Sequence, residues 1–337
     1  MGSNPATPTR IAIILIKENH EILNRLISWV NRFQQKHKFI GFSYAVQKKY
    51  SEDNGGYQAA LLTYYGFLSL FPLLLVAVSV LQIILHSHPS IQSDVLRHIT
   101  QYFPIVGNQL DTTVHGRGGT GVALVIGILL TAWGAKGVAD VFQYNLNHSW
   151  GVPRVHRPGF PKGDLKSLAI IVLGAIGLAV AAFLSGFASN IDRLFIFRIL
   201  SVLVSLIVLL GIFWLIFKLG LAYSNINKKA LLYSVVVAAV GVQILQIIGG
   251  LLVTRELRNL KHLYGTFAAT LGLLFWIYLQ ARVFMYAAAT GAVYDKKLWP
   301  RSLVGSELTD ADRRSIADQA KKERSIVPER IGVGFKK

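Results

Sequence analysis

Long apolar segments without a single charged side chain recur along the chain. A transmembrane helix needs about 20 mostly apolar residues, because each residue advances about 1.5 Å across a hydrocarbon core of about 30 Å. Six segments have this character: Tyr57–Leu85, Gly118–Ala135, Ser167–Asn190, Ile199–Phe217, Ala230–Thr254 and Leu263–Ala281. The second is expected to continue through Lys136 toward Asp140, and the last continues past Arg282 to Tyr294. The pattern predicts an all-α, polytopic membrane protein with six transmembrane helices, because a soluble core of so many charge-free helices needs a longer chain.

An amphipathic pattern precedes the first span. Apolar side chains recur at helical spacing at Ile22, Leu26, Trp29, Val30 and Phe33, with charged side chains on the other faces. This predicts an N-terminal amphipathic helix. Two interpretations stand equally: the helix lies on the cytoplasmic headgroup layer with Trp29 as its anchor, or it packs on the protein's own cytoplasmic surface.

Two further segments outside the spans have a helical signal. In the loop 86–117, a stripe of apolar residues from Ile91 to Phe103 predicts a short external helix that Pro104 ends. The tail after Trp299 is polar and mixed in charge, which predicts a solvated and partly disordered appendage. Within it, Thr309 and Asp312 have the spacing of a capping box that would open a short helix.

Composition and charge agree with this architecture and give it an orientation. Apolar residues make up 53% of the chain and charged residues 15%, below the share of about 25% in soluble domains. Of the 35 Lys and Arg residues, 27 lie in 1–56, 136–166, 218–229 and 295–337, and seven lie in the other three loops. Because positive charge is retained in the cytoplasm, both termini are predicted to be cytoplasmic.

This distribution of charge divides the chain into three regions. It also explains the net charge of +18 by membrane topology. Residues 1–56 form a cytoplasmic amphipathic region, 57–294 the six-helix transmembrane domain and 295–337 a cytoplasmic polar tail. The basic residues follow the topology and suit anionic lipid headgroups, so nucleic acid is not an expected partner. Membrane lipids are the expected partners, and the sequence leaves the oligomeric state open.

Motifs for catalysis or cofactor binding are absent from the sequence. The lack of cysteine excludes disulfides, thiolate metal sites and a Cys nucleophile. There is no phosphate-binding Gly-Lys-Ser/Thr loop, zinc-protease motif or nucleophile elbow. The histidines of the external loop are interpreted as ordinary polar loop residues, without a metal. We therefore expect a protein that is not an enzyme and needs no cofactor.

Polar residues inside the spans are the candidates for a binding site, because hydrocarbon disfavours them and they tend to face an interior. Arg282, with Gln280 nearby, either contacts an anionic group in a cavity or extends its side chain to the cytoplasmic interface. Lys136 and Asp140 are four residues apart, which favours an internal ion pair.

The first span adds a second group of candidates. Tyr64, Tyr65 and Ser69 precede Pro72, whose missing N–H leaves the carbonyl of Leu68 without its donor. A kink or break near the middle of the helix is therefore predicted, and in transporters such breaks line binding sites. Small residues four apart in the last span, such as Ala287 and Gly291, predict close helix packing.

Several short motifs, in order along residues 40–300, resemble the YihY/BrkB family of bacterial inner-membrane proteins. They are Leu68-Ser-Leu-Phe-Pro72, Leu96-Arg-His98, Leu146-Asn-His-Ser-Trp150, Tyr264-Gly265 and Leu274-Phe-Trp-Ile-Tyr278. The segment Asp53-Asn-Gly-Gly-Tyr57 and the long N-terminus are similar to the YhjD-like branch. The chain departs from the family at Ala289-Thr-Gly-Ala-Val293, where members often have Gly-Ala-Glu.

The resemblance implies a six-span envelope-integrity protein linked to the movement of lipids or lipid-linked precursors, and it brings no catalytic residues. An old family label as ribonuclease BN is regarded as mistaken, in agreement with the missing nuclease constellation. Our first hypothesis is a translocator of lipid or of anionic or lipid-linked amphiphiles that works without ATP. The second is a scaffold that organises envelope proteins without transport.

Overall fold

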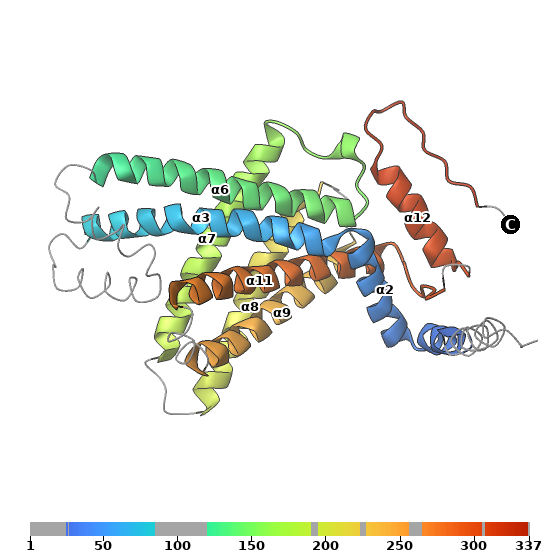
Figure 1. Cartoon of the computed structure of the whole chain (residues 1–337), viewed down its shortest axis with the longest axis horizontal. Helices are drawn as coiled ribbons and strands as arrows, with labels where there is room; N and C mark the ends of the chain where they lie inside the picture. The colour runs from blue at the N-terminus through green and yellow to red at the C-terminus, as the bar shows by residue number, and fades with distance from the viewer. Residues whose placement is uncertain are drawn as a thin grey trace, which may run out of the picture.

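The computed structural model describes residue 25 and residues 27–84, 120–189, 195–222, 227–255, 265–304 and 307–335. All regular secondary structure in these ranges is helical, which confirms the all-α class (Figure 1). The predicted external helix lies outside the described residues, as do Ile22 and Leu26 of the N-terminal pattern.

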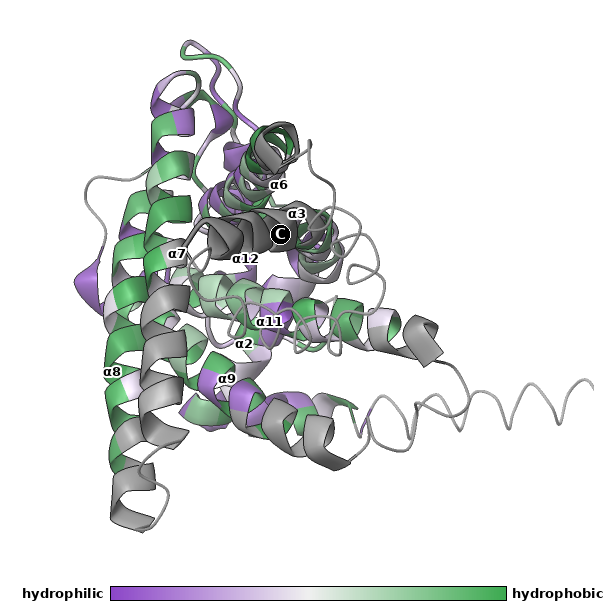
Figure 2. Ribbon diagram, turned by 90° about the vertical axis from the view of Figure 1, so that its left-hand side faces the viewer, coloured by the Kyte–Doolittle hydropathy of each residue, from purple (hydrophilic) through white to green (hydrophobic). Residues whose placement is uncertain are grey.

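A long helix occupies each place where a span is predicted. These helices are α3 (Gly55–Ile84), α6 (Thr120–Ser149), α7 (Lys162–Ser189), α8 (Phe195–Gly220), α9 (Lys228–Arg255) and α11 (Gly265–Asp295). Within the described residues, four of them (α6, α8, α9 and α11) contain segments long and apolar enough to cross a membrane. That α3 and α7 also cross the membrane, for six crossings in all, stays a prediction. Figure 2 shows the hydrophobic character of α8 along most of its length.

The six long helices close into a ring in chain order. Neighbours pack in the sequence α3, α6, α7, α8, α9 and α11, and α11 then returns to pack against α3. Figures 1 and 2 show α7 and α8 running side by side and crossing the direction shared by α3 and α6. The ring therefore joins the first and last long helices of the chain directly.

Among the side chains that the structure describes, most of the buried core lies toward the end of the ring that carries α2 (Lys38–Glu52) and α12 (Asp310–Lys322), called here the α2/α12 end. Edge-on aromatic contacts connect three helices there. The ring centroids of Phe142 of α6 and Phe217 of α8 are 5.5 Å apart, and those of Phe284 of α11 and Phe213 of α8 are 5.2 Å apart. Elsewhere, outward-facing leucine and isoleucine side chains are exposed, as expected for helices surrounded by lipid.

Small side chains allow α9 and α11 to approach closely, as the sequence predicts. A Cβ atom added at Gly291 would lie 2.0 Å from the Ser234 hydroxyl oxygen and 3.0 Å from the Ala230 carbonyl oxygen. The neighbouring Ala287 is fully buried. Only glycine fits at position 291 without displacing α9.

The chain stays helical at Pro72, so of the predicted kink or break the break does not occur, and a kink stays a prediction. α3 runs without interruption from Gly55 to Ile84, although Pro72 removes one backbone donor. The helix is held by α6 on one side and by α11 on the other, and such packing tolerates the loss of a single hydrogen bond. The side chain of Pro72 lies outside the described residues.

The tail is folded against the protein, which corrects the prediction of a solvated appendage. Thr309 and Asp312 form the predicted capping box at the start of α12. Ala311, Asp312 and Ser315 are buried, because α12 lays one face on α2 and on the chain after α11. Charged side chains from distant parts of the sequence pair across this contact, which the mixed composition of the tail does not reveal.

The N-terminal helix turns its polar side to this tail. Residues 27–36 are helical, and Asn31 and Gln34 are buried against the segment that follows α11, where the Leu303 N–H donates to Asn31 Oδ1 at 2.9 Å. Trp29, Val30 and Phe33, on the apolar side, are exposed.

Candidate functional site

Arg282 of α11 lies within a cage of three tyrosine rings. Its guanidinium carbon is 5.8 Å from the ring centroids of Tyr50, Tyr278 and Tyr286, a distance at which cation–π attraction acts. Tyr50 comes from α2 and stacks on Tyr286 with 4.1 Å between centroids. The Tyr286 hydroxyl donates to Gln47 Oε1 at 2.6 Å, which fixes the ring in place. We call Arg282 and these three rings the tyrosine cage.

The guanidinium of the cage has hydrogen-bonding capacity to spare. Arg282 Nε is buried without a hydrogen-bond partner, and Nη2 makes a long contact of 3.5 Å to the Tyr286 hydroxyl. Among the described residues, Arg282 forms no ion pair with a carboxylate. A buried donor that lacks an acceptor costs free energy, so the cage suits a ligand with an anionic or acceptor group.

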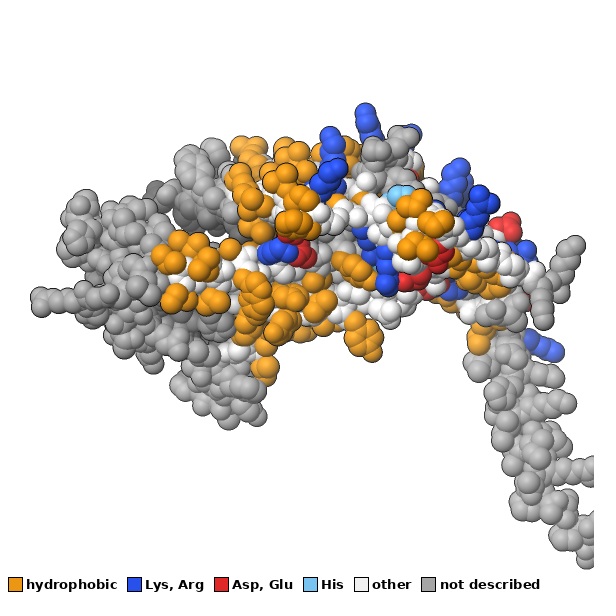
Figure 3. Space-filling model, turned by 90° about the horizontal axis from the view of Figure 1, so that it is seen from above, with side chains coloured by type: hydrophobic (Ala, Val, Ile, Leu, Met, Phe, Trp, Pro, Cys, Tyr) orange, Lys and Arg blue, Asp and Glu red, His pale blue; other side chains and the backbone are white. Residues whose placement is uncertain are grey.

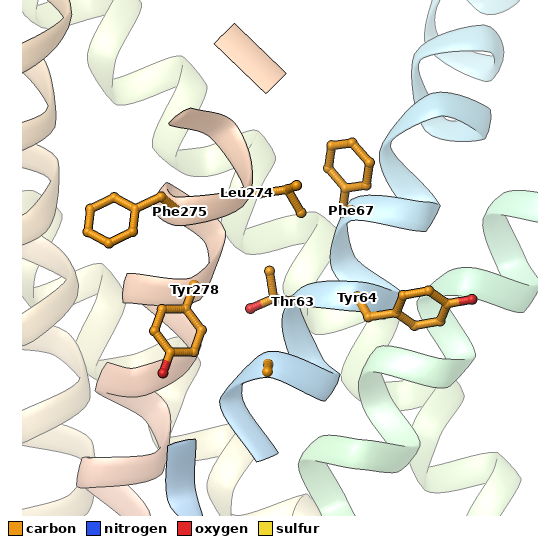
Figure 4. A pocket seen from close by; sticks show the side chains of 7 residues that line it. Thr63, Tyr64, Phe67, Leu274, Phe275 and Tyr278 are labelled. Carbon is orange, nitrogen blue, oxygen red and sulfur yellow. The ribbon is translucent and has the colours of Figure 1, made fainter. Parts of the chain in front are cut away.

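An apolar groove adjoins the cage between α3 and α11. It has a volume of about 350 Å³ and is lined by Ala60, Thr63, Tyr64 and Phe67 of α3 and by Leu274, Phe275 and Tyr278 of α11. Figure 4 shows Phe67 and Leu274 facing the space between the two helices, with Tyr278 farther along α11. Tyr278 belongs to both sites, so the groove and the cage are contiguous.

The structure separates the other candidates of the first span. Tyr64 lies at the groove and is 58% exposed. Tyr65 instead packs flat on Gly137 of α6, where an added Cβ would lie 2.2 Å from its ring. Ser69 donates to the Gly66 carbonyl at 2.9 Å and packs beside Gly134 of α6. Tyr65 and Ser69 therefore belong to the α3–α6 contact and not to the groove.

The predicted site residues on the other helices lie in two different places. Gln280 is half-buried on α11, two residues before Arg282. Lys136 and Asp140 form the predicted ion pair at 2.6 Å, and Asp164 of α7 approaches Lys136 Nζ to 3.3 Å. This group lies between α6 and α7 and adjoins a different pocket.

A buried charge network at the α2/α12 end was missed by the sequence reasoning. Its centre is Arg301, 1% exposed, whose Nε lies 2.6 Å from Asp312 and whose Nη2 pairs with Glu52. Lys48 of α2 also reaches Asp312, at 2.9 Å. We call these four residues, with the second group described next, the tail-docking network.

The second group of the network surrounds Asp53, between α2 and α3. Lys49 lies 2.8 Å and Lys322 of α12 lies 3.0 Å from its carboxylate, and Lys322 Nζ also lies 2.8 Å from His148 Nε2 of α6. All of these side chains are largely buried. Because buried charges are stable only when paired, the network holds the two ends of the chain together.

Both carboxylates at the centre of the network are stabilised in the charged form. Burial raises the pKa of Asp53, but the ammonium groups of Lys49 and Lys322 outweigh burial and hold the pKa below its ordinary value. Burial likewise raises the pKa of Asp312, and hydrogen bonds led by the one from Arg301 hold the pKa far below its usual range.

Tail docking is therefore expected to weaken in acid. A carboxylate whose pKa is lowered by folding contributes stability above its unfolded pKa, about 3.9, and loses it as the pH falls through the folded pKa. Amide hydrogen exchange of α12, corrected for the intrinsic rate, should show full protection at pH 7 and declining protection below about pH 4. Amides of α9 serve as the internal control, and protection of α12 that is constant down to pH 2 would contradict the assignment.

The ring of long apolar helices with polar side chains gathered at one end defines a polytopic α-helical membrane protein. Comparison with known families agrees: residues 46–307 match the family described as virulence factor BrkB. The chain belongs to the BrkB family. It is also 24% identical over 295 residues to the inner membrane protein YhjD of Escherichia coli strain K12, covering 79% of this chain and 85% of that protein. No solved structure matches the chain.

Proposed function

We propose that this protein resides in the bacterial inner membrane with both termini in the cytoplasm, and moves an anionic amphiphile across or within the membrane without ATP. The described parts of both terminal regions lie at the α2/α12 end, which an even number of crossings requires (Figure 1). That end carries the basic side chains expected on the cytoplasmic side. The name of the relative YhjD supports the inner membrane.

The observation that carries the proposal is the junction of the tyrosine cage with the groove. An acyl chain fits the apolar space between Phe67 and Leu274, and an acidic headgroup fits the spare donors of Arg282. Arginine binds phosphate and carboxylate strongly because it offers donors in a planar fork. The proposed role of the site is binding and movement of the amphiphile.

Loss of the guanidinium is expected to slow movement of the amphiphile strongly. Full-length protein is reconstituted in vesicles of phosphatidylethanolamine and phosphatidylglycerol that contain a fluorescent phosphatidylglycerol, and quenching by dithionite measures its flip rate. Wild type should raise the rate above that of empty vesicles, and Arg282→Gln should lower it about tenfold or more, since a charge-assisted hydrogen bond is worth about 1.5–3 kcal/mol. Arg282→Lys should retain part of the rate.

The matched control is Arg330→Gln, which removes an exposed arginine from the tail and should leave the rate unchanged. Equal rates in wild type and Arg282→Gln would contradict the role of the cage.

Rates in wild-type vesicles equal to those in empty vesicles would favour the second candidate, a scaffold for envelope proteins. One observation supports that role: the N-terminal helix presents Trp29 and Phe33 outward while its polar side holds the tail.

A further inference from the structure

A second arginine with unused donors lies on another face of the ring. Arg157 stands in the segment between α6 and α7, after the 3₁₀ turn η1 (Arg154–His156). Its Nε donates to the Val152 carbonyl at 3.1 Å, and its guanidinium carbon lies 4.9 Å from the centroid of the Tyr144 ring. Both Nη atoms are buried and have no hydrogen-bond partner among the described residues. The guanidinium is thus fixed in position with two donors free.

Arg157 lines a pocket of about 260 Å³ at the α2/α12 end. Its walls come from α6, from the start of α7 and from the segment between them, and the lining residues used below are Asp140, Tyr144, Arg157, Phe160 and Asp164. Pockets for drug-sized ligands start at about 300 Å³. The size therefore suits the headgroup of a lipid better than a whole amphiphile.

The charges around the pocket are arranged as a dipole. Arg157 supplies one positive charge, whereas Asp140 and Asp164 supply two negative charges that share the single ammonium of Lys136. Counting the lining residues and Lys136, one side of the pocket is thus positive by one unit and the other negative by one unit. A group that carries a phosphate and an ammonium matches both sides, whereas a singly anionic headgroup leaves the acidic side unmatched.

Apolar side chains lead from this pocket into the region of the bilayer. Phe160, 88% exposed, stands at the pocket, and Leu165, 70% exposed, begins a stripe that continues along α7 through Leu168, Val172 and Ile176. The spacing of three and four residues places these side chains on one helix face. Figure 3, which looks onto the α6 side, shows positive and negative side chains side by side among hydrophobic ones.

We propose that this pocket binds the headgroup of a zwitterionic phospholipid with a primary ammonium, such as phosphatidylethanolamine. The phosphate accepts hydrogen bonds from the two free Nη groups of Arg157, and the ammonium lies toward Asp140 and Asp164. The acyl chains follow the α7 stripe. The site is separate from the tyrosine cage, and the inference does not rest on the proposed transport.

Native mass spectrometry of the full chain in detergent, with phosphatidylethanolamine or phosphatidylglycerol added, tests the assignment. Wild type should retain one phosphatidylethanolamine in preference to phosphatidylglycerol. Arg157→Gln should weaken that binding about tenfold or more, as expected for loss of charge-assisted hydrogen bonds. Arg154→Gln is the matched control, because Arg154 belongs to the same segment but pairs with Glu323 in an exposed ion pair at 2.7 Å, and this variant should bind like wild type.

A second variant, Asp164→Asn, tests the acidic side and should abolish the preference for phosphatidylethanolamine over phosphatidylglycerol while binding to Arg157 persists. Undiminished phosphatidylethanolamine binding in Arg157→Gln would overturn the site. Stronger binding of phosphatidylglycerol to wild type, lost in Arg157→Gln, would overturn the zwitterionic assignment in favour of an anionic headgroup. The absence of any retained lipid on wild type would overturn both the site and the assignment of its headgroup.

Discussion

Replacing Arg301 by Met is expected to release α12 from the rest of the protein. The substitution keeps most of the side-chain volume but leaves Asp312, 1% exposed, with Lys48 as its one charged partner among the described residues. Removing one member of a buried ion pair costs about 3–5 kcal/mol, because the other charge stays buried. Amide hydrogen exchange should show a large loss of protection over Asp310–Lys322, and limited proteolysis should cleave the tail.

The control is Arg154→Met, which removes an ion pair of the same tail, with Glu323, in which both side chains are about half exposed. Exposed pairs contribute about 0–1 kcal/mol, so α12 should stay protected in this variant. Protection of α12 that is equal in Arg301→Met and wild type would show that the charge network does not hold the tail.

A methyl group added to α11 at Gly291 is expected to destabilise the ring. The new Cβ would lie within 3.0 Å of Ser234, Trp150 and the Ala230 backbone, and a backbone atom moves only with its helix. Overpacking of this kind costs about 1–3 kcal/mol, against a gain of about 1 kcal/mol in helix propensity. Thermal unfolding in detergent should therefore give a lower midpoint for Gly291→Ala.

Gly272 offers the matched control, because it lies in the same helix and an added Cβ would meet no described atom within 4 Å. Gly272→Ala should leave the midpoint unchanged or raise it slightly, since only the propensity gain applies. A midpoint for Gly291→Ala at or above that of Gly272→Ala would mean that α9 and α11 can separate without cost.

Features encoded in short stretches of sequence were predictable. The long helices follow from uninterrupted apolar segments, the Lys136–Asp140 pair from a spacing of four residues, and the start of α12 from the capping box. The ion pair and the capping box each depend on side chains within one or two helical turns, where the backbone fixes which residues meet.

The contacts that the sequence did not reveal join distant residues. Lys322 and Asp53 are 269 positions apart, and Arg282 meets Tyr50 only because α2 folds back against α11. The basic residues of both terminal regions were explained by topology alone, so their acidic neighbours received no role. The acids Glu52, Asp53 and Asp312, set among many basic residues, were the available signal for the tail-docking network.

The closed ring of helices has one junction unlike the others. Five of its neighbouring pairs are consecutive along the chain, so a connecting segment limits how far each pair can part. The α3–α11 junction joins the first and last long helices and has no such tether. The apolar groove lies on this junction, and the ion pair between Glu52 and Arg301 links the residues that flank the two helices. The contact of α3 with α11 beside the groove is therefore held by noncovalent interactions alone, and this ion pair is one of them.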